Sequence, residues 1–355
     1  MDVLFINRCL TGGGSEKAMV LIANYLARKG KRVGMILLVK DEASYVLDPS
    51  IQVIECFCPI EGNKLLWHFK RILTIRETLK KVDAGHIVSF MWDINVNVIL
   101  ASMGLHKRVI CSERCDPRNE KRPFINFAIK YILPFADYTI FQTPLVQSYY
   151  PKKVQRKSEV IPNSIGNMPS VIKYEERKKI IVAIGRLTEQ KNFELLIETF
   201  KDFYDVHQEY KLVIYGDGEL RNNLETLVSS LNLDANVELP GYVSNVTEKI
   251  AEAQMYVNSS NYEGISNAML EALAMGIPCV CTNCPVGGAA MVIKDHKNGI
   301  LINVGEKQEL LEAMLEVAEN EEFAKALSEN ATKIRIDYSV EKIGAQWENA
   351  IFKVQ

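Results

Sequence analysis

The stretch Asn261-Tyr-Glu-Gly-Ile-Ser-Asn-Ala-Met-Leu-Glu271-Ala-Leu-Ala-Met-Gly-Ile-Pro278 has two glutamates eight positions apart around the start of an apolar helix. Glu263 and Gly264 are typical of a loop, and Ser266 is typical of a helix N-cap. The backbone amides around this start, together with the positive end of the helix dipole, favour an anion such as a diphosphate. The residues that would surround this anion are Gly264, Ile265, Ser266 and Asn267.

The two glutamates suit the sugars of a nucleotide sugar, because carboxylates accept hydrogen bonds from hydroxyl groups. Glu263, expected before the helix, would bind a hexose, and Glu271, expected two turns inside it, would bind the diol of a ribose. The alternative is that both are solvated helix charges, since glutamates at this spacing are common. The strands expected on either side, Met255–Asn258 and Pro278–Thr282, favour a ligand site at the ends of parallel strands.

Short apolar runs alternate with longer amphipathic segments along the chain, which is typical of parallel sheets connected by helices. The first series has expected strands at Val3–Asn7, Val33–Val39, His86–Phe90 and Val109–Ser112, and helices at Glu16–Lys29, Leu65–Lys81 and Val96–Ser102. The second has expected strands at Ile180–Ile184, Lys211–Tyr215, Val237–Leu239, Met255–Asn258 and Pro278–Thr282, and helices at Phe193–His207, Leu220–Leu231 and Ile265–Met275. The predicted fold class is α/β, with two Rossmann-like doubly wound domains.

The length of 355 residues fits two domains of ordinary size. The boundary is expected at Ile161-Pro162-Asn163-Ser164 and the polar run after it, which gives domains of residues 1–165 and 166–337. The segment 338–355 is expected to form a separate helix, with Tyr338–Phe352 as its core.

Two cations follow the expected strand that ends at Ile184. Arg186 and Lys191 come after Gly185, and both are in a position to reach one diphosphate. An arginine fork and a mobile lysine suit the charge that develops on a departing diphosphate. The alternative is a surface arginine and a lysine at a helix start, although a lysine there opposes the helix dipole.

Two further loops contain glycines. Gly216 lies in Tyr215-Gly216-Asp217-Gly218-Glu219, where a simple turn and a ligand role are equally supported. Gly13 and Gly14 lie in Thr11-Gly12-Gly13-Gly14-Ser15-Glu16, between the first strand and the first helix. This second loop is neither a dinucleotide fingerprint nor a P-loop, but its backbone can still approach a phosphate.

Glu113 follows the expected strand Val109–Ser112, at an end where ligands bind in such sheets. It would accept a hydroxyl hydrogen bond, orient an acceptor or act as a base, and the residue type alone does not decide among these roles. The adjacent Arg114 gives a second interpretation, in which the two side chains form an ion pair.

The charge differs between the two halves of the chain. Residues 1–165 hold 24 basic and 15 acidic residues, a charge of +9, and the remainder has a charge of −11. No RGG tract, zinc-finger spacing or RNP-like string is present, so an anionic membrane or a diphosphate-linked acceptor is favoured over nucleic acid. The stretches Lys64–Lys81 and Lys121–Tyr131 mix aromatic and basic residues, which is typical of a membrane interface and also of an ordinary amphipathic helix.

Two features bear on location and on metal binding. Met1–Ile6 has too short an apolar run for a signal peptide, and no segment reaches 18 uncharged apolar residues. We therefore expect a cytoplasmic protein, peripheral on the inner face of the membrane. Cys279, Cys281 and Cys284, with Cys56 and Cys58, suggest a metal, but thiols in an apolar strand usually pack as small hydrophobic groups. We expect no metal site.

The motifs together resemble the retaining glycosyltransferases of family 4, which have the GT-B fold. The motifs that carry the resemblance are the two-glutamate stretch, Ile184–Asn192, Tyr215–Glu219, Leu239–Val243 and the segment Ser112-Glu113-Arg114-Cys115-Asp116-Pro117. The resemblance covers most of the chain and is strongest to bacterial transferases that extend lipid-linked oligosaccharides.

The resemblance implies two domains facing across a cleft, with the helix in 338–355 crossing back to the first. It implies that Arg186 and Lys191 hold the diphosphate without a metal, that Gly13 and Gly14 face the donor phosphates, and that backbone groups near Val243 read uracil. Many relatives have an acid where Met291 stands, so a donor contact from Met291 is doubtful.

We therefore expect a retaining transferase that moves a hexose or N-acetylhexosamine from a UDP-sugar to a lipid-linked glycan in bacterial surface polysaccharide synthesis. Attack from the leaving-group face follows from the resemblance, because no side-chain nucleophile is evident. The alternatives are a nucleotide-sugar epimerase, a sugar-phosphate synthase of the same architecture, and a non-catalytic subunit that binds sugar nucleotides. Loss of the two diphosphate cations would have favoured the last, and both are present.

Overall fold

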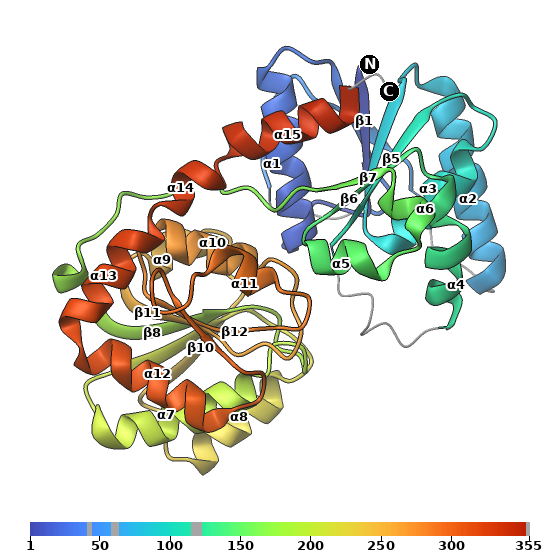
Figure 1. Ribbon diagram of the computed structural model, residues 1–355. Helices are drawn as coiled ribbons and strands as arrows, with labels where there is room; N and C mark the ends of the chain where they lie inside the picture. The colour runs from blue at the N-terminus through green and yellow to red at the C-terminus, as the bar shows by residue number, and fades with distance from the viewer. Residues whose placement is uncertain (41–44, 58–63, 115–122, 353–355) are drawn as a thin grey trace. The chain divides into compact units, whose positions relative to one another are not determined.

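The computed structural model describes residues 1–40, 45–57, 64–114 and 123–352 and divides the chain into two compact units (Figure 1). Unit 1 comprises Met1–Ser164 and Val340–Gln355, and unit 2 comprises Ile165–Ser339. The chain therefore passes between the units twice, at residues 164–165 and 339–340.

Unit 1 contains a seven-stranded parallel sheet with the strand order β3-β2-β1-β4-β5-β6-β7. Its elements are β1 (Val3–Asn7), α1 (Gly14–Arg28), β2 (Val33–Leu37), β3 (Gln52–Glu55), α2 (Lys64–Lys81), β4 (His86–Phe90), α3 (Trp92–Ser102), β5 (Arg108–Glu113), α4 (Pro123–Tyr131), the 3-10 helix η2 (Leu133–Phe135), β6 (Tyr138–Phe141), α5 (Pro144–Tyr149), α6 (Lys152–Gln155), β7 (Ser158–Val160) and α15 (Val340–Phe352). The order of the strands reverses between β1 and β4, which makes this the switch point of the sheet.

Unit 2 contains a six-stranded parallel sheet with the order β10-β9-β8-β11-β12-β13. Its elements are the 3-10 helix η3 (Tyr174–Glu176), β8 (Lys178–Ile184), α7 (Phe193–Val206), β9 (Lys211–Tyr215), α8 (Arg221–Ser230), β10 (Val237–Gly241), α9 (Val246–Ile250), β11 (Ala253–Asn258), α10 (Asn267–Ala274), β12 (Cys279–Thr282), α11 (Gly288–Val292), β13 (Ile300–Ile302), α12 (Lys307–Glu319), α13 (Glu321–Ala331) and α14 (Ile334–Asp337). The switch point of this sheet lies between β8 and β11.

The predicted α/β fold with two doubly wound sheets is confirmed. The strands β3, β6, β7 and β13 were not among the expected strands. Each has only three or four residues, which is too short to show an apolar period. Helix α3 begins at Trp92, four residues before its expected start.

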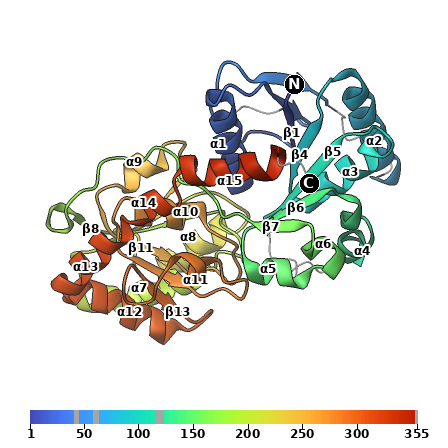
Figure 2. The ribbon, with the colours of Figure 1, turned by 45° about the horizontal axis from the view of Figure 1, so that its top comes forward.

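Helix α15 packs in unit 1 although it is distant from that unit's strands in sequence. It lies alongside α1 (Figures 1 and 2). The indole ring of Trp347 is 1% exposed and stacks on Phe90 of β4, with 5.3 Å between the ring centroids. A Cβ at Gly344 would lie 2.5 Å from the ring of Tyr25 on α1, so this glycine allows the two helices to approach closely.

Among the residues that the structure describes, no helix combines the length and the apolar character needed to cross a bilayer.

Trp347→Ala should lower the free energy of unfolding by about 3–5 kcal/mol, because it leaves a cavity between α15 and the sheet. Urea unfolding followed by circular dichroism measures this change. Phe69→Ala is the matched control, because Phe69 of α2 is 61% exposed. Equal stability of the two variants would contradict the packing of α15 in the core of unit 1.

Candidate functional site

Two loops meet at the switch point of the sheet in unit 2. Residues 185–192 follow β8, and residues 259–266 follow β11, which pairs with β8 in parallel. The carboxyl ends of these two strands therefore lie side by side. The two loops contain Gly185, Arg186, Lys191, Glu263 and Ser266, all of which were expected to contribute to one site.

Hydrogen bonds join the two loops directly. The Asn261 amide donates to the carbonyl of Gln190 at 2.8 Å, and the Gln190 side chain donates to the carbonyl of Tyr262 at 3.0 Å. The further bonds run from Asn261 Nδ2 to Glu189 O (2.8 Å), from Asn192 Nδ2 to Asn261 Oδ1 (3.0 Å), and from Ser259 Oγ to Lys191 O (2.9 Å) and Asn192 O (3.0 Å). These contacts fix the backbone on both sides of Lys191 and Glu263.

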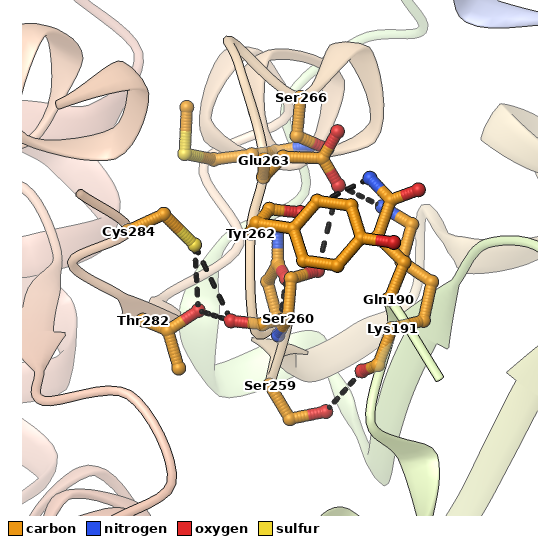
Figure 3. Close-up of polar contacts among 11 residues, drawn as sticks. Gln190, Lys191, Ser259, Ser260, Tyr262, Glu263, Ser266, Thr282 and Cys284 are labelled. Atoms are coloured by element: carbon orange, nitrogen blue, oxygen red, sulfur yellow. Dashed lines mark hydrogen bonds and ion pairs between the residues drawn. The ribbon is translucent and has the colours of Figure 1, made fainter. Parts of the chain in front are cut away.

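Lys191 and Glu263 form an ion pair through Nζ and Oε2, as Figure 3 shows. Their side chains are only 14% and 20% exposed. The Ser260 hydroxyl also lies 3.4 Å from Glu263 Oε2. Lys191 does not lie in α7 itself, because the helix begins at Phe193 and Asn192 adopts a left-handed conformation with φ of 48°. The sequence indicated both residues for the site but not their direct contact.

Arg186 lies in the same loop with an exposed side chain. Within the described ranges it forms no ion pair. Lys191 is thus neutralised by a carboxylate, whereas the guanidinium of Arg186 remains open to an anion.

Helix α10 begins at Asn267, and Ser266 is its N-cap. The Ser266 hydroxyl accepts a hydrogen bond from the Met269 amide at 3.3 Å, as the sequence predicted. Glu271 is the fifth residue of the helix, one turn from its start and not two as expected, and it is 5% exposed. Gly264 and Ile265 connect this helix to Glu263.

Close backbone packing explains several glycines around the site. A Cβ at Gly216, which has φ of 140°, would overlap the carbonyl of Gly185, and a Cβ at Gly288 would overlap that of Gly264. A Cβ at Gly185 would lie 2.6 Å from Cε of Lys191. For Gly216, which the sequence left open between a turn and a ligand role, the structure gives a packing requirement.

The remaining expected residue of unit 2 is Val243, which follows β10. Gly241 ends this strand with φ of 86°, and its carbonyl accepts a hydrogen bond from the Gly216 amide at 2.9 Å. Tyr242 is 54% exposed beside Val243. Met291 lies in α11, where its carbonyl accepts a hydrogen bond from the Tyr338 hydroxyl at 3.2 Å.

In unit 1, Gly13 and Gly14 form the start of α1, at the carboxyl end of β1. The Tyr45 hydroxyl donates to the carbonyl of Gly13 at 3.1 Å. A Cβ at Gly13 would overlap the carboxylate of Glu16 in the first turn. The loop therefore already has a carboxylate against its backbone.

Glu113 is the last residue of β5 rather than the first residue after it, and it is 4% exposed. Asn95 of α3 donates to its Oε1 at 2.8 Å. Burial raises the pKa of the Glu113 carboxyl to about 7, although the Asn95 hydrogen bond opposes this shift.

Arg114 does not form the ion pair with Glu113 that was one interpretation of the sequence. Its guanidinium donates to Ser112 Oγ at 2.8 Å and to Asn163 Oδ1 at 2.6 Å. It also lies over the rings of Phe90 and Trp347, 4.8 and 5.4 Å from their centroids. Residues 115–117 of the same motif lie outside the described residues.

The cysteines expected to pack as apolar groups are buried at Cys56, Cys279, Cys281 and Cys284, and Cys58 lies outside the described residues. Cys284 Sγ is 3.3 Å from the carbonyl of Ser260 (Figure 3). Among the described side chains, no group of three His, Cys, Asp or Glu residues is arranged to hold a metal ion.

Residues 166–334 match the family model described as Glycosyl transferases group 1. The chain is 28% identical over 360 residues to the GalNAc-alpha-(1->4)-GalNAc-alpha-(1->3)-diNAcBac-PP-undecaprenol alpha-1,4-N-acetyl-D-galactosaminyltransferase of Campylobacter jejuni, with 100% of this chain and 99% of that protein covered. It is 23% identical to the amylovoran biosynthesis glycosyltransferase AmsD of Erwinia amylovora, with 98% and 99% covered.

Two solved structures share the fold. HepE of Anabaena, in complex with UDP and glucose, gives a TM-score of 0.84 at 17% identity, with 100% of both chains covered. A sucrose-phosphate synthase from Thermosynechococcus elongatus also gives 0.84, at 18% identity, with 98% of this chain and 97% of that chain covered. At 17–18% sequence identity, this similarity establishes the fold but does not identify the acceptor.

Glu113→Gln should make the stability of the chain less dependent on pH. Because the folded pKa lies above the unfolded one, the wild type loses stability as the pH rises from about 4.5 to about 7, by about 3 kcal/mol in total. The amide keeps an acceptor for Asn95 but has no charge to bury, so the variant should be the more stable protein at pH 8.

Denaturant unfolding at pH 5 and pH 8 measures this difference. Glu55→Gln, which changes an exposed carboxylate on β3, should keep the wild-type pH dependence. A Glu113→Gln variant with the wild-type pH dependence would show that Glu113 is not the buried acid responsible.

Proposed function

We infer the substrates of this chain from one premise: its residues 166–334 belong to the family of glycosyl transferases group 1, and the chain is a glycosyltransferase. We propose that it transfers a hexose or N-acetylhexosamine from a UDP-sugar, with retention of configuration. The proposed acceptor is a lipid-linked glycan in bacterial surface polysaccharide synthesis.

The observation that carries the donor assignment is the charge arrangement at the switch point of unit 2. Three groups lie around the ends of the neighbouring strands β8 and β11. They are the exposed Arg186, the Lys191–Glu263 ion pair and the N-terminus of α10. Such a group suits a ligand with a diphosphate and hydroxyl groups. HepE, which shares the fold, was solved with UDP and glucose.

In the proposed mechanism the diphosphate binds between Arg186 and Lys191. Negative charge grows on the diphosphate as the bond to the sugar breaks, and the two cations stabilise this charge. Glu263 accepts hydrogen bonds from the sugar hydroxyls, and Glu271 accepts them from the ribose.

The lysine's ion pair sets the local charge before the donor arrives. Glu263 alone would repel a diphosphate, and Lys191 neutralises it at close range. Binding then needs only a modest reorientation of the lysine side chain, because hydrogen bonds already fix its backbone.

The acceptor assignment rests on unit 1 and on the relatives. The Campylobacter jejuni relative bears the name of an enzyme that extends an undecaprenol-linked glycan. The basic residues of the first half suit an acceptor with a diphosphate in an anionic membrane. We propose that Glu113 of unit 1 binds or orients the acceptor, and that Gly13 and Gly14 bind the donor phosphates. We also propose that the protein works as a peripheral protein on the cytoplasmic face of the membrane.

Removing both cations with Arg186→Ala/Lys191→Ala should weaken UDP binding by a few kcal/mol, about 1.5–3 kcal/mol for each charge-assisted contact. Calorimetry with UDP measures the loss. Lys249→Ala/Lys297→Ala removes two exposed cations elsewhere in unit 2 and is the control. Unchanged UDP affinity in the first variant would refute the donor assignment.

A second pair of variants separates the two roles of the lysine. Lys191→Ala leaves the Glu263 carboxylate without its counter-charge, so Lys191→Ala/Glu263→Gln should bind UDP more tightly than Lys191→Ala alone. Equal UDP affinity of these two variants would limit Lys191 to a direct contact with the diphosphate.

Turnover with a UDP-sugar should persist in EDTA, because Arg186 and Lys191 supply the charge that a divalent cation would otherwise provide. Release of UDP measures turnover with and without the chelator. Activity that is abolished by EDTA and restored by Mn²⁺ or Mg²⁺ would overturn the proposal of metal-independent transfer.

A further inference from the structure

Exposed aromatic side chains gather on one flank of unit 1. Phe127 and Tyr131 of α4 are 53% and 51% exposed, and Phe135 of η2 is 62% exposed. The rings of Phe127 and Tyr131 are in contact, with 4.8 Å between their centroids. More than half of each side chain is therefore open to solvent.

Lysines lie against these same rings. Lys130 Nζ is 5.3 Å from the centroid of Tyr131, and Lys153 Nζ of α6 is 5.6 Å from that of Phe135. The five residues Phe127, Lys130, Tyr131, Phe135 and Lys153 form what we call the aromatic-lysine surface. It joins α4, η2 and α6, which are neighbours in unit 1 (Figure 1).

The charged residues in this part of the sequence are mainly basic. Between residues 123 and 156 the sequence has Lys130, Lys152, Lys153 and Arg156 and a single acid, Asp137. The Asp137 carboxylate accepts a hydrogen bond from the Val109 amide at 2.7 Å. A second copy of this chain would bring like charges together, whereas anionic lipid headgroups complement them.

The sequence left the stretch of α2 open between a membrane-facing helix and an ordinary amphipathic helix, and named Lys121–Tyr131, which overlaps α4, as the second candidate. Arg71 is only 6% exposed, and its guanidinium lies 5.1 Å from the centroid of the Trp67 ring. Lys80 pairs with Glu77 at 2.7 Å. Arg71 and Lys80 of this stretch are thus engaged by other residues of α2.

We propose that the aromatic-lysine surface docks unit 1 on an anionic lipid bilayer, with the rings of Phe127, Tyr131 and Phe135 inserted at the interface. Phenylalanine and tyrosine are well suited to this boundary, and lysines place their charge among the headgroups. The inference rests on the proposed lipid-linked acceptor and specifies the face that meets its membrane.

The position of the surface in the chain agrees with that role. Helix α4 is the next described element after β5, whose last residue is Glu113. In sequence, the surface therefore follows the strand whose carboxyl end we assign to the acceptor.

Sedimentation with vesicles tests the proposal. Wild type should bind vesicles of phosphatidylcholine mixed with phosphatidylglycerol, bind phosphatidylcholine alone weakly, and lose binding as salt rises. Phe127→Ala/Tyr131→Ala/Phe135→Ala should lower the partition coefficient on the anionic vesicles by about tenfold or more. Its unfolding midpoint should match that of wild type, because all three rings are exposed.

Two matched variants provide the controls. Val171→Ala/Val206→Ala/Ile336→Ala removes exposed apolar groups of unit 2 and should bind vesicles as wild type does. Lys70→Gln/Lys80→Gln/Lys81→Gln changes cations of α2 and should retain most of the binding. Wild-type binding by the triple aromatic variant, or a larger loss in the α2 variant, would overturn the proposal.

UDP calorimetry distinguishes this failure from failure of the proposed function. If the aromatic variant binds vesicles and UDP as wild type does, the docking surface is wrong and the donor assignment stands. If wild type fails to bind UDP, the donor assignment fails whatever the vesicles show.

Discussion

The constraint on which the candidate site depends is the approach of one backbone to another at the carboxyl edge of the second sheet. Gly216 packs on the carbonyl of Gly185, and Gly288 packs on that of Gly264. Any side chain at Gly216 or Gly288 would push these loops apart. The loops therefore pack directly on each other. Hydrogen bonds between residues 189–192 and 259–262 also fix the relative position of their backbones. Charged side chains on such a base need little ordering when a ligand arrives, which reduces the entropic cost of binding.

The two units differ in how their buried charged groups are stabilised. In unit 2, Lys191 and Glu263 of the candidate site form an ion pair. Their attraction offsets part of the desolvation cost of burying the two charges. In unit 1 Glu113 is buried and forms no ion pair with another described residue, and burial raises its pKa to about 7. A carboxyl with a pKa of about 7 exchanges its proton easily near neutral pH.

The sequence predicted the parts of this protein that depend on local pattern. The alternation of strands and helices, the N-cap at Ser266 and the loop positions of Arg186 and Lys191 all follow from neighbouring residues. The sequence did not predict contacts between residues that are distant in the chain. Lys191 and Glu263 are 72 positions apart in sequence, and only the pairing of β8 with β11 brings them together. The short strands β6 and β7 have too few residues for a period, and the burial of Arg71 depends on packing around Trp67.

Helix α15 has a consequence for how the chain is made. Unit 1 needs Trp347 to cover Phe90 and Arg114, yet the whole of unit 2, residues 165–339, is synthesised in between. At roughly 5–20 residues per second, the ribosome takes on the order of ten to thirty seconds to deliver the missing helix. Unit 2 is continuous in sequence and is able to fold before α15 has packed on unit 1. Until then, the residues of unit 1 that Trp347 covers remain exposed. The interval creates a period in which chaperones and proteases compete for the first half of the protein.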